Sequence, residues 1–200
     1  MKGNYMHRFS LSGTSIFLVL FLTLTPWVIS LAAEKKVALY DNSGCAAVLL
    51  KDQEYFPALI AAIDGAKSEI ILSFFLFKSG VHKSSYPDRV LSHLVLAAQR
   101  GVNVKVLLEN SGGRDRNIDA ENSKTKQLLQ AKGVEVYLDS AHITTHTKLV
   151  VIDQRLVLLG SHNLTQSALK YNNEMSIMIN RPELAREVHN YLMKIIKESK

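Results

Sequence analysis

Residues 146–163 read HTKLVVIDQRLVLLGSHN, and this stretch decides the fold. It contains two apolar runs, 147–152 and 156–160, with only three polar residues between them. Two short runs so closely spaced are typical of an antiparallel hairpin. We expect Asp153 and Gln154 to form the two-residue turn that joins its strands.

That turn sets the register of the hairpin. It pairs Ile152 with Arg155, which places His146 opposite Ser161 on the neighbouring strand. Residues two apart on a strand share a face of the sheet. Four side chains are therefore predicted to converge at one end of the sheet: His146, Lys148, Ser161 and Asn163.

This group of side chains suits a phosphodiester. The Lys148 ammonium and the Asn163 amide can donate hydrogen bonds to phosphate oxygens and stabilise the charge of a pentacoordinate transition state. The His146 imidazole is a nucleophile near neutral pH. Glu174 begins the next apolar run and is placed to accept a hydrogen bond from the far nitrogen of that ring. His162 has the opposite parity and is expected in a loop, outside the group.

Short apolar runs alternate with amphipathic stretches from residue 37 onward. The apolar runs predict strands over residues 37–40, 70–77, 102–108, 134–138 and 174–179. The amphipathic stretches predict helices over residues 53–67, 88–100 and 121–132, and a last helix that opens at Pro182. Because strands and helices alternate before the hairpin, we expect one α/β domain with a mixed β-sheet sandwiched between helices.

Residues 1–32 have the anatomy of a signal peptide. Two basic residues precede an apolar run, and Ser30 and Ala32 have the spacing that a signal peptidase requires. We expect cleavage after Ala32 and an exported chain of residues 33–200, either periplasmic or secreted. The alternative is an uncleaved membrane anchor, because residues 9–33 carry no charge and are long enough to span a bilayer.

The net charge indicates an anionic partner, such as nucleic acid or a phospholipid surface. The 200-residue chain has 24 basic and 18 acidic residues, which gives a formal charge of +6. Residues 1–32 contain two of the basic residues and no acidic ones, so +4 remains on residues 33–200. The one cysteine, Cys45, excludes a disulfide framework and a cysteine-rich zinc site.

Six residues at fixed spacing match a known signature: His146, Lys148, Asp153, Gly160, Ser161 and Asn163. Their pattern resembles the motif of the phospholipase D superfamily at every position. The resemblance covers nearly all of residues 33–200 and is strongest to small secreted endonucleases that carry a single motif. It implies a phospholipase D-like fold with one motif per chain.

In that superfamily, two motifs meet across a twofold axis to form one active site. The chain has no second copy, because neither His82 nor His93 is followed by residues at the motif's spacing. The resemblance therefore implies a homodimer, in which His146 of one chain becomes a phosphohistidine and His146 of the other protonates the leaving oxygen. Lys148 and Asn163 would bind the phosphate, and no metal or cofactor is implied. The remaining motif residues would support the site or the fold: Ser161, Asp153 and Gly160.

Two basic loops are expected to frame the site, at residues 78–88 and 109–120. Their cations are candidates for phosphate contacts along a nucleic acid: Lys78, Lys83, Arg114 and Arg116. Tyr86, in the first loop, is a candidate for stacking on a base.

The leading hypothesis is a metal-independent endonuclease that cleaves DNA or RNA with little sequence preference. One alternative is phospholipase D activity on a phospholipid headgroup. The possible membrane anchor supports this alternative. The other is a non-catalytic, dimeric nucleic-acid-binding module.

Overall fold

The structure, a computed structural model, describes residues 46–199. Three features expected from the sequence lie outside the described residues: the leader of residues 1–32, the strand at 37–40 and Cys45. None of the helices within residues 46–199 is long and apolar enough to cross a membrane.

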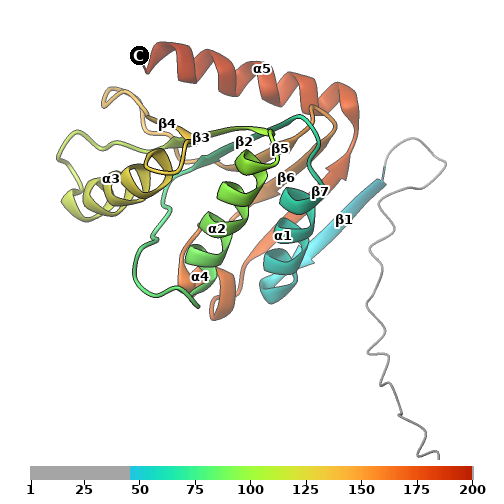
Figure 1. The fold of residues 1–200 in the computed structure, drawn as a ribbon, viewed down its shortest axis with the longest axis horizontal. Helices are drawn as coiled ribbons and strands as arrows, with labels where there is room; N and C mark the ends of the chain where they lie inside the picture. Colours follow the sequence, from blue (N-terminus) through green and yellow to red (C-terminus); the bar gives the residue numbers. More distant parts are fainter. Residues whose placement is uncertain (1–45, 200) are drawn as a thin grey trace, which may run out of the picture. The chain divides into compact units, whose positions relative to one another are not determined.

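Seven strands form a mixed sheet in the order β1-β7-β6-β5-β2-β3-β4 (Figure 1). They are β1 (Ala46–Lys51), β2 (Glu69–Phe74), β3 (Asn103–Leu108), β4 (Glu135–Leu138), β5 (Lys148–Ile152), β6 (Leu156–Gly160) and β7 (Met175–Asn180). The pairs β2 with β3 and β3 with β4 are parallel, and the other neighbouring strands are antiparallel. The mixed sheet predicted from the sequence is confirmed.

Helices cover both faces of this sheet. They are α1 (Tyr55–Gly65), α2 (Tyr86–Gln99), α3 (Arg116–Gln130), α4 (Gln166–Lys170) and α5 (Pro182–Glu198). The helix α5 lies apart from the others in Figure 1 and buries Leu192 and Ile196 in a core with Ile71 of β2. Buried residues of α1 to α4 join the larger core on the other face, together with Ile70 and Leu72. The alternation along β2 thus explains why its apolar run is continuous, since both of its faces are buried.

The predicted catalytic and substrate-binding residues lie in segments that leave the sheet at one end of its strands, which we call the motif edge. The strand registers align its members: Lys51, Phe74, Leu108, Leu138, Lys148, Gly160 and Met175. The strands β2, β3 and β4 end at this edge, whereas β5 begins there. The turn between β5 and β6 lies at the opposite edge.

The turn of the hairpin is the one that the sequence predicts. Asp153 and Gln154 have φ angles of +51° and +50°. The backbone N–H of Arg155 donates a hydrogen bond to the carbonyl oxygen of Ile152 at 2.9 Å. Two residues with positive φ inside such a bond define a two-residue hairpin turn that follows the twist of the strands.

The register of the hairpin differs from the prediction by one residue. Ile152 lies opposite Leu156 rather than Arg155. Arg155 is therefore an extra residue, a β-bulge, whose carbonyl oxygen accepts a hydrogen bond of 3.1 Å from the backbone that follows β7. Extending this register places His146 opposite position 162, so the prediction that His146 faces Ser161 is wrong.

Other boundaries also differ from the predictions. The helix α3 begins at Arg116 rather than at residue 121, because the Asp115 side chain caps it by accepting hydrogen bonds from two backbone N–H groups at 3.1 and 3.2 Å. The predicted strand 70–77 ends at Phe74. The short elements β1 and α4 have no counterpart in the sequence prediction, because five or six residues show too little periodicity.

A substitution at Gly160 can test the packing of β6 against β7. A Cβ atom at this position would overlap the Ser176 side chain and the Met175 carbonyl oxygen. We expect Gly160→Ala to lower the free energy of unfolding by about 1–3 kcal/mol, as overpacking does, in urea denaturation. The control is Gly65→Ala, whose Cβ would meet no atom within 4 Å. Equal stability of the two variants would contradict this packing.

Candidate active site

His146 and Lys148 meet at the point where β5 enters the sheet. The His146 side chain is exposed, whereas Lys148 is 9% exposed. Lys148 Nζ lies 3.0 Å from the His146 carbonyl oxygen and 3.4 Å from His146 Nε2. Phe75, directly after β2, supports both residues: its ring centroid lies 4.6 Å from that of His146 and 5.1 Å from Lys148 Nζ. The sequence analysis did not name Phe75 as a site residue, because it lies within the apolar run 70–77 like many core residues.

The contact between the two side chains favours one tautomer of the imidazole. A lysine ammonium has hydrogens to donate and no lone pair, so Nε2 of His146 must be the acceptor. In the neutral ring the proton then lies on Nδ1, and Nε2 keeps a lone pair beside a positive charge. Such an atom is suited to attack an anionic phosphorus centre.

Glu174 completes the charge balance around Lys148. Burial lowers the pKa of the Lys148 ammonium below its ordinary value, and the negative charge of Glu174 acts in the opposite direction. The structure therefore brings the predicted lysine and the predicted carboxylate close enough for their charges to interact, although they form no ion pair within 4.0 Å. A half-buried carboxylate at this position favours the charged form of Lys148 that a phosphate requires.

The Glu174 carboxylate contacts Ser161 and not the His146 ring. Ser161 Oγ donates a short hydrogen bond to Glu174 Oε2, and Asn172 Nδ2 donates to Oε1 at 3.0 Å. Ser161 takes this position because its backbone N–H pairs with the Met175 carbonyl oxygen at 3.0 Å, directly beside Glu174. Among the described residues, the predicted hydrogen bond between Glu174 and His146 is absent.

His162 is a fully buried residue inside the motif, although the sequence indicated only a loop position. Its ring stacks on Tyr55, with centroids 4.3 Å apart and planes inclined by 9°. Nε2 lies 2.9 Å from the Asp52 carbonyl oxygen, and Nδ1 lies 2.7 Å from Ser176 Oγ. A carbonyl only accepts, so Nε2 carries the proton. The Asp52 carboxylate in turn accepts from the Glu174 backbone N–H at 2.8 Å, which links His162 to the site.

Asn163 has a buried group without a partner. Among residues 46–199, no hydrogen-bond partner faces its buried Oδ1 atom. Rotation of the amide by 180° would put the NH₂ group in the same place, where it would donate to a phosphate oxygen. The next residue, Leu164, donates its N–H to the Leu76 carbonyl oxygen at 3.0 Å, so the backbone of Asn163 adjoins the segment that carries Phe75.

Two buried carboxylates hold the segment that precedes His146. The Thr145 backbone N–H donates to Glu109 Oε2 at 2.6 Å, and its hydroxyl donates to Asp139. Burial raises the pKa of Glu109, and the neighbouring Asp139 charge adds to this effect. The sequence analysis missed these positions, although each acid directly follows an apolar strand that ends at the motif edge.

Asp153 lies at the opposite edge and binds backbone. Its carboxylate accepts hydrogen bonds from the N–H groups of Lys67, Ser68 and Glu69 at 2.9, 2.7 and 2.9 Å. Burial acts to raise the pKa of Asp153, but these hydrogen bonds outweigh it and hold the pKa below its ordinary value. The carboxylate thus ties the hairpin turn to the start of β2.

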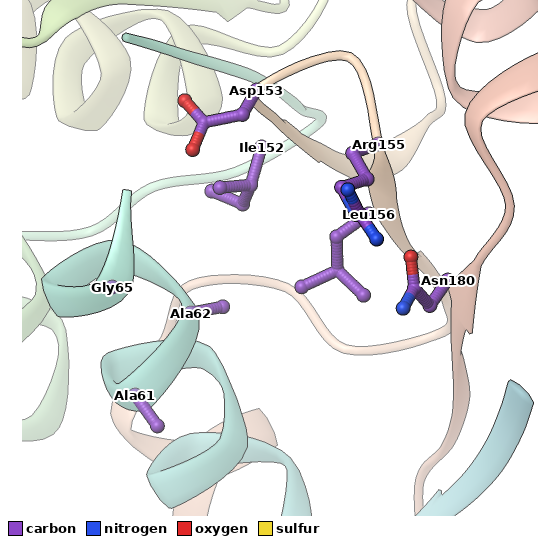
Figure 2. A pocket seen from close by; sticks show the side chains of 8 residues that line it. All are labelled: Ala61, Ala62, Gly65, Ile152, Asp153, Arg155, Leu156 and Asn180. Atoms are coloured by element: carbon purple, nitrogen blue, oxygen red, sulfur yellow. The ribbon is translucent and has the colours of Figure 1, made fainter. Parts of the chain in front are cut away.

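A pocket adjoins Asp153 at this opposite edge (Figure 2). Its lining residues come from α1, the hairpin turn and the end of β7: Ala61, Ala62, Gly65, Ile152, Asp153, Arg155, Leu156 and Asn180. None of the predicted catalytic side chains lines it, since these lie at the motif edge.

The predicted loop cations have different surroundings. Lys78 Nζ forms an ion pair of 2.7 Å with Glu121, so its charge is already matched. Arg114 approaches the Thr144 hydroxyl at 3.5 Å, and its charge also faces Glu109. Two others, Lys83 and Arg116, are exposed. Their assignment to a substrate stays a prediction.

Tyr86 does not present a free ring to a base. Its ring stacks on Phe56, with centroids 4.2 Å apart. The cations of Arg89 and Lys170 lie 5.6 and 5.8 Å from its centroid. One face of the ring is therefore already covered by Phe56, and the stacking of Tyr86 on a base stays a prediction.

Solved structures share this architecture. Nuc from Salmonella typhimurium, a phospholipase D family member, superposes with a TM-score of 0.66 at 24% identity, over 78% of this chain and 97% of that chain. NucT from Helicobacter pylori superposes with a TM-score of 0.61 at 18% identity, over 77% of this chain and 97% of that chain. These likenesses define a phospholipase D-like α/β fold.

Sequence comparison identifies the family of the chain. The model of the family described as "Cardiolipin synthase, PLD-like domain" matches residues 59–196, which include the whole motif. The chain therefore belongs to the phospholipase D superfamily.

Curated relatives match over part of their length. A phospholipase D of Rickettsia bellii is 37% identical over 106 residues, which are 52% of this chain and 50% of the relative. Cardiolipin synthase A of Pectobacterium carotovorum is 27% identical over 118 residues, which are 54% of this chain and 23% of the relative. The chain thus spans about half the length of the similar phospholipase D.

The buried position of His162 can be tested by measuring stability as a function of pH. Burial lowers the pKa of His162 below its ordinary value of 6.5, so the unfolded chain binds more protons between the two pKa values. We expect the free energy of unfolding to fall as the pH drops from 6.5 towards the folded-state pKa, and this dependence to be weaker in His162→Gln. Nitrogen NMR should show the proton on Nε2 at neutral pH. A ring with its proton on Nδ1, or a pKa above 6.5, would contradict the buried network.

Proposed function

We propose that the protein is a phosphodiesterase that cleaves nucleic acid through a covalent phosphohistidine on His146. The observation that supports this proposal most directly is the contact of Lys148 Nζ with His146 Nε2 at 3.4 Å. It places a nucleophilic lone pair and a cation side by side on an exposed ring. A bound phosphate would take over the hydrogen bonds of the ammonium while the imidazole attacks.

The reaction has two steps. In the first, the Nε2 lone pair of His146 forms a bond to phosphorus, and the bond from phosphorus to the leaving oxygen breaks with its electron pair on oxygen. A general acid protonates that oxygen. In the second, water attacks phosphorus and loses a proton to the same group, and the bond to nitrogen breaks. The products are a phosphomonoester and an alcohol, and His146 is regenerated.

We propose that the general acid is His146 of a second copy of this chain. One motif supplies one histidine, and the exposed position of His146 leaves it accessible to a partner. The buried, unpaired amide oxygen of Asn163 also supports an incomplete site, because buried polar groups normally have hydrogen-bond partners. After rotation of the amide by 180°, its NH₂ group would take that place and donate to a phosphate clamped by both copies.

Several cations without a close ion pair favour a polymer as substrate. Among residues 46–199, no ion pair within 4.0 Å includes the following cations near the motif edge: Lys83, Arg114, Arg116 and Lys170. A single headgroup offers one phosphate, whereas a nucleic acid offers a row of phosphates to such cations. This distribution of charge supports a nuclease.

A phospholipid headgroup is the second candidate substrate. Three large apolar side chains at the motif edge, two in loops and one at the start of β7, are strongly exposed: Ile143 by 76%, Val81 by 65% and Met175 by 56%. Apolar side chains of this kind can insert into a lipid surface. The phospholipase D and cardiolipin synthase relatives point to the same class of substrate.

Activity assays separate these candidates. In EDTA, we expect the protein to cleave plasmid DNA and RNA, and we expect His146→Ala to lose about a thousandfold or more of this activity. The matched control is His142→Ala, which removes another exposed histidine from the same segment. Acid-labile, alkali-stable label from an oligonucleotide with ³²P in its internal phosphodiesters should be trapped on His146. Cleavage of phospholipid vesicles alone would overturn the nuclease proposal, and absence of all turnover would leave a binding module.

A further inference from the structure

Tyr171 is an exposed aromatic residue at the motif edge. Its side chain is 69% exposed, and it follows α4 directly, three residues before Glu174. Two hydrogen bonds fix the local backbone, since the N–H groups of Tyr171 and Asn172 both donate to the Ser167 carbonyl oxygen, at 2.8 and 2.9 Å. The Asn172 side chain donates to Glu174 at 3.0 Å. The ring is therefore attached to the candidate site by a short, ordered segment.

Lys170 holds a positive charge against this ring. Its Nζ atom lies 5.2 Å from the Tyr171 centroid and 5.8 Å from the Tyr86 centroid, so the cation contacts two rings. The Gln53 side chain fixes the backbone by donating to the Lys170 carbonyl oxygen at 3.0 Å. No carboxylate of residues 46–199 forms an ion pair with Lys170. Its charge is thus available to an anionic ligand.

The two tyrosines near Lys170 differ in a decisive way. Tyr86 is half-buried and packs against Phe56, whereas Tyr171 has no ring neighbour within residues 46–199. An exposed aromatic ring with an adjacent cation matches the two parts of a nucleotide, since the ring can stack on a base and the cation can bind its phosphate.

We infer that Tyr171 and Lys170 form a nucleotide subsite beside the reacting phosphate, which binds one unpaired base of a single-stranded substrate. This inference rests on the proposed nuclease function and narrows it to single strands. In a duplex each base is already stacked on its neighbours, so the ring has no free base face to cover. An unpaired base lacks that restriction, and stacking on an aromatic side chain is independent of base identity.

The test compares a long and a short substrate. The long substrate is a single-stranded oligonucleotide, and the short one is bis(p-nitrophenyl) phosphate, which has no base. We expect Tyr171→Ala to raise KM for the oligonucleotide about five- to fiftyfold and to leave cleavage of the short diester unchanged. Tyr171→Phe, which keeps the ring, should stay within about twofold of the wild type. Lys170→Gln should raise the same KM and weaken its salt dependence.

The matched control is Tyr191→Ala, because Tyr191 is 54% exposed on α5 and far from the motif in sequence. It should behave as the wild type. Unchanged oligonucleotide KM in Tyr171→Ala, with the short diester still cleaved, would overturn the subsite alone. If the Tyr171→Ala variant is a monomer while the wild type is a dimer, the ring contacts the second copy of the chain. That result would also overturn the subsite. Failure of the wild type on both substrates would overturn the proposed function together with the subsite.

Discussion

The antiparallel pairing of β5 with β2 is the constraint on which the site depends. It sets Lys148, the first residue of β5, opposite Phe74, the last residue of β2. The chain before β5 and the chain after β2 must then leave the sheet together. Phe75 therefore lies against both His146 and Lys148, and its backbone N–H pairs with the Thr147 carbonyl oxygen at 3.0 Å. The histidine and the lysine owe their contact to this register.

Buried polar groups give the surrounding loops a fixed shape. His162 and Asp52 hold the backbone that carries Glu174, while Glu109 and Asp139 hold Thr145 next to His146. Burial of such groups is costly unless each finds a hydrogen-bond partner, so a network of this kind strongly favours one arrangement. The His146 ring, which we propose to react, can remain exposed because the segments on both sides of it are anchored beneath the surface.

Most of the fold can be predicted from the periodicity of the sequence. The apolar run of β2, the helical stripes of α1, α2 and α5, and the turn at Asp153 and Gln154 all follow from local patterns. The bulge at Arg155 does not, because it depends on a hydrogen bond to the backbone after β7, a contact distant in sequence. Local patterns therefore found both strands of the hairpin but paired them one residue out of register.

The same holds for the site: residues close in sequence could be predicted as neighbours, whereas contacts between distant segments could not. The sequence predicts His146, Lys148 and Glu174 as neighbours. In the structure Lys148 contacts His146, and the charge of Glu174 acts on it from a greater distance. The partner of the Glu174 carboxylate could not be found in this way, because the bond to Ser161 depends on how β6 pairs with β7. Burial of His162 likewise depends on Tyr55, more than a hundred residues away.

The central claim is that one chain holds half of an active site, and mixed dimers test it most directly. Wild-type and His146→Ala chains with different affinity tags are co-expressed, and the mixed species is isolated through both tags. Random pairing of equal amounts should leave about one quarter of the activity of the same total amount of wild type, since one pair in four contains two histidines. The isolated mixed dimer should be inactive. Half of the activity in the mixture, or an active wild-type monomer in sedimentation, would contradict the account.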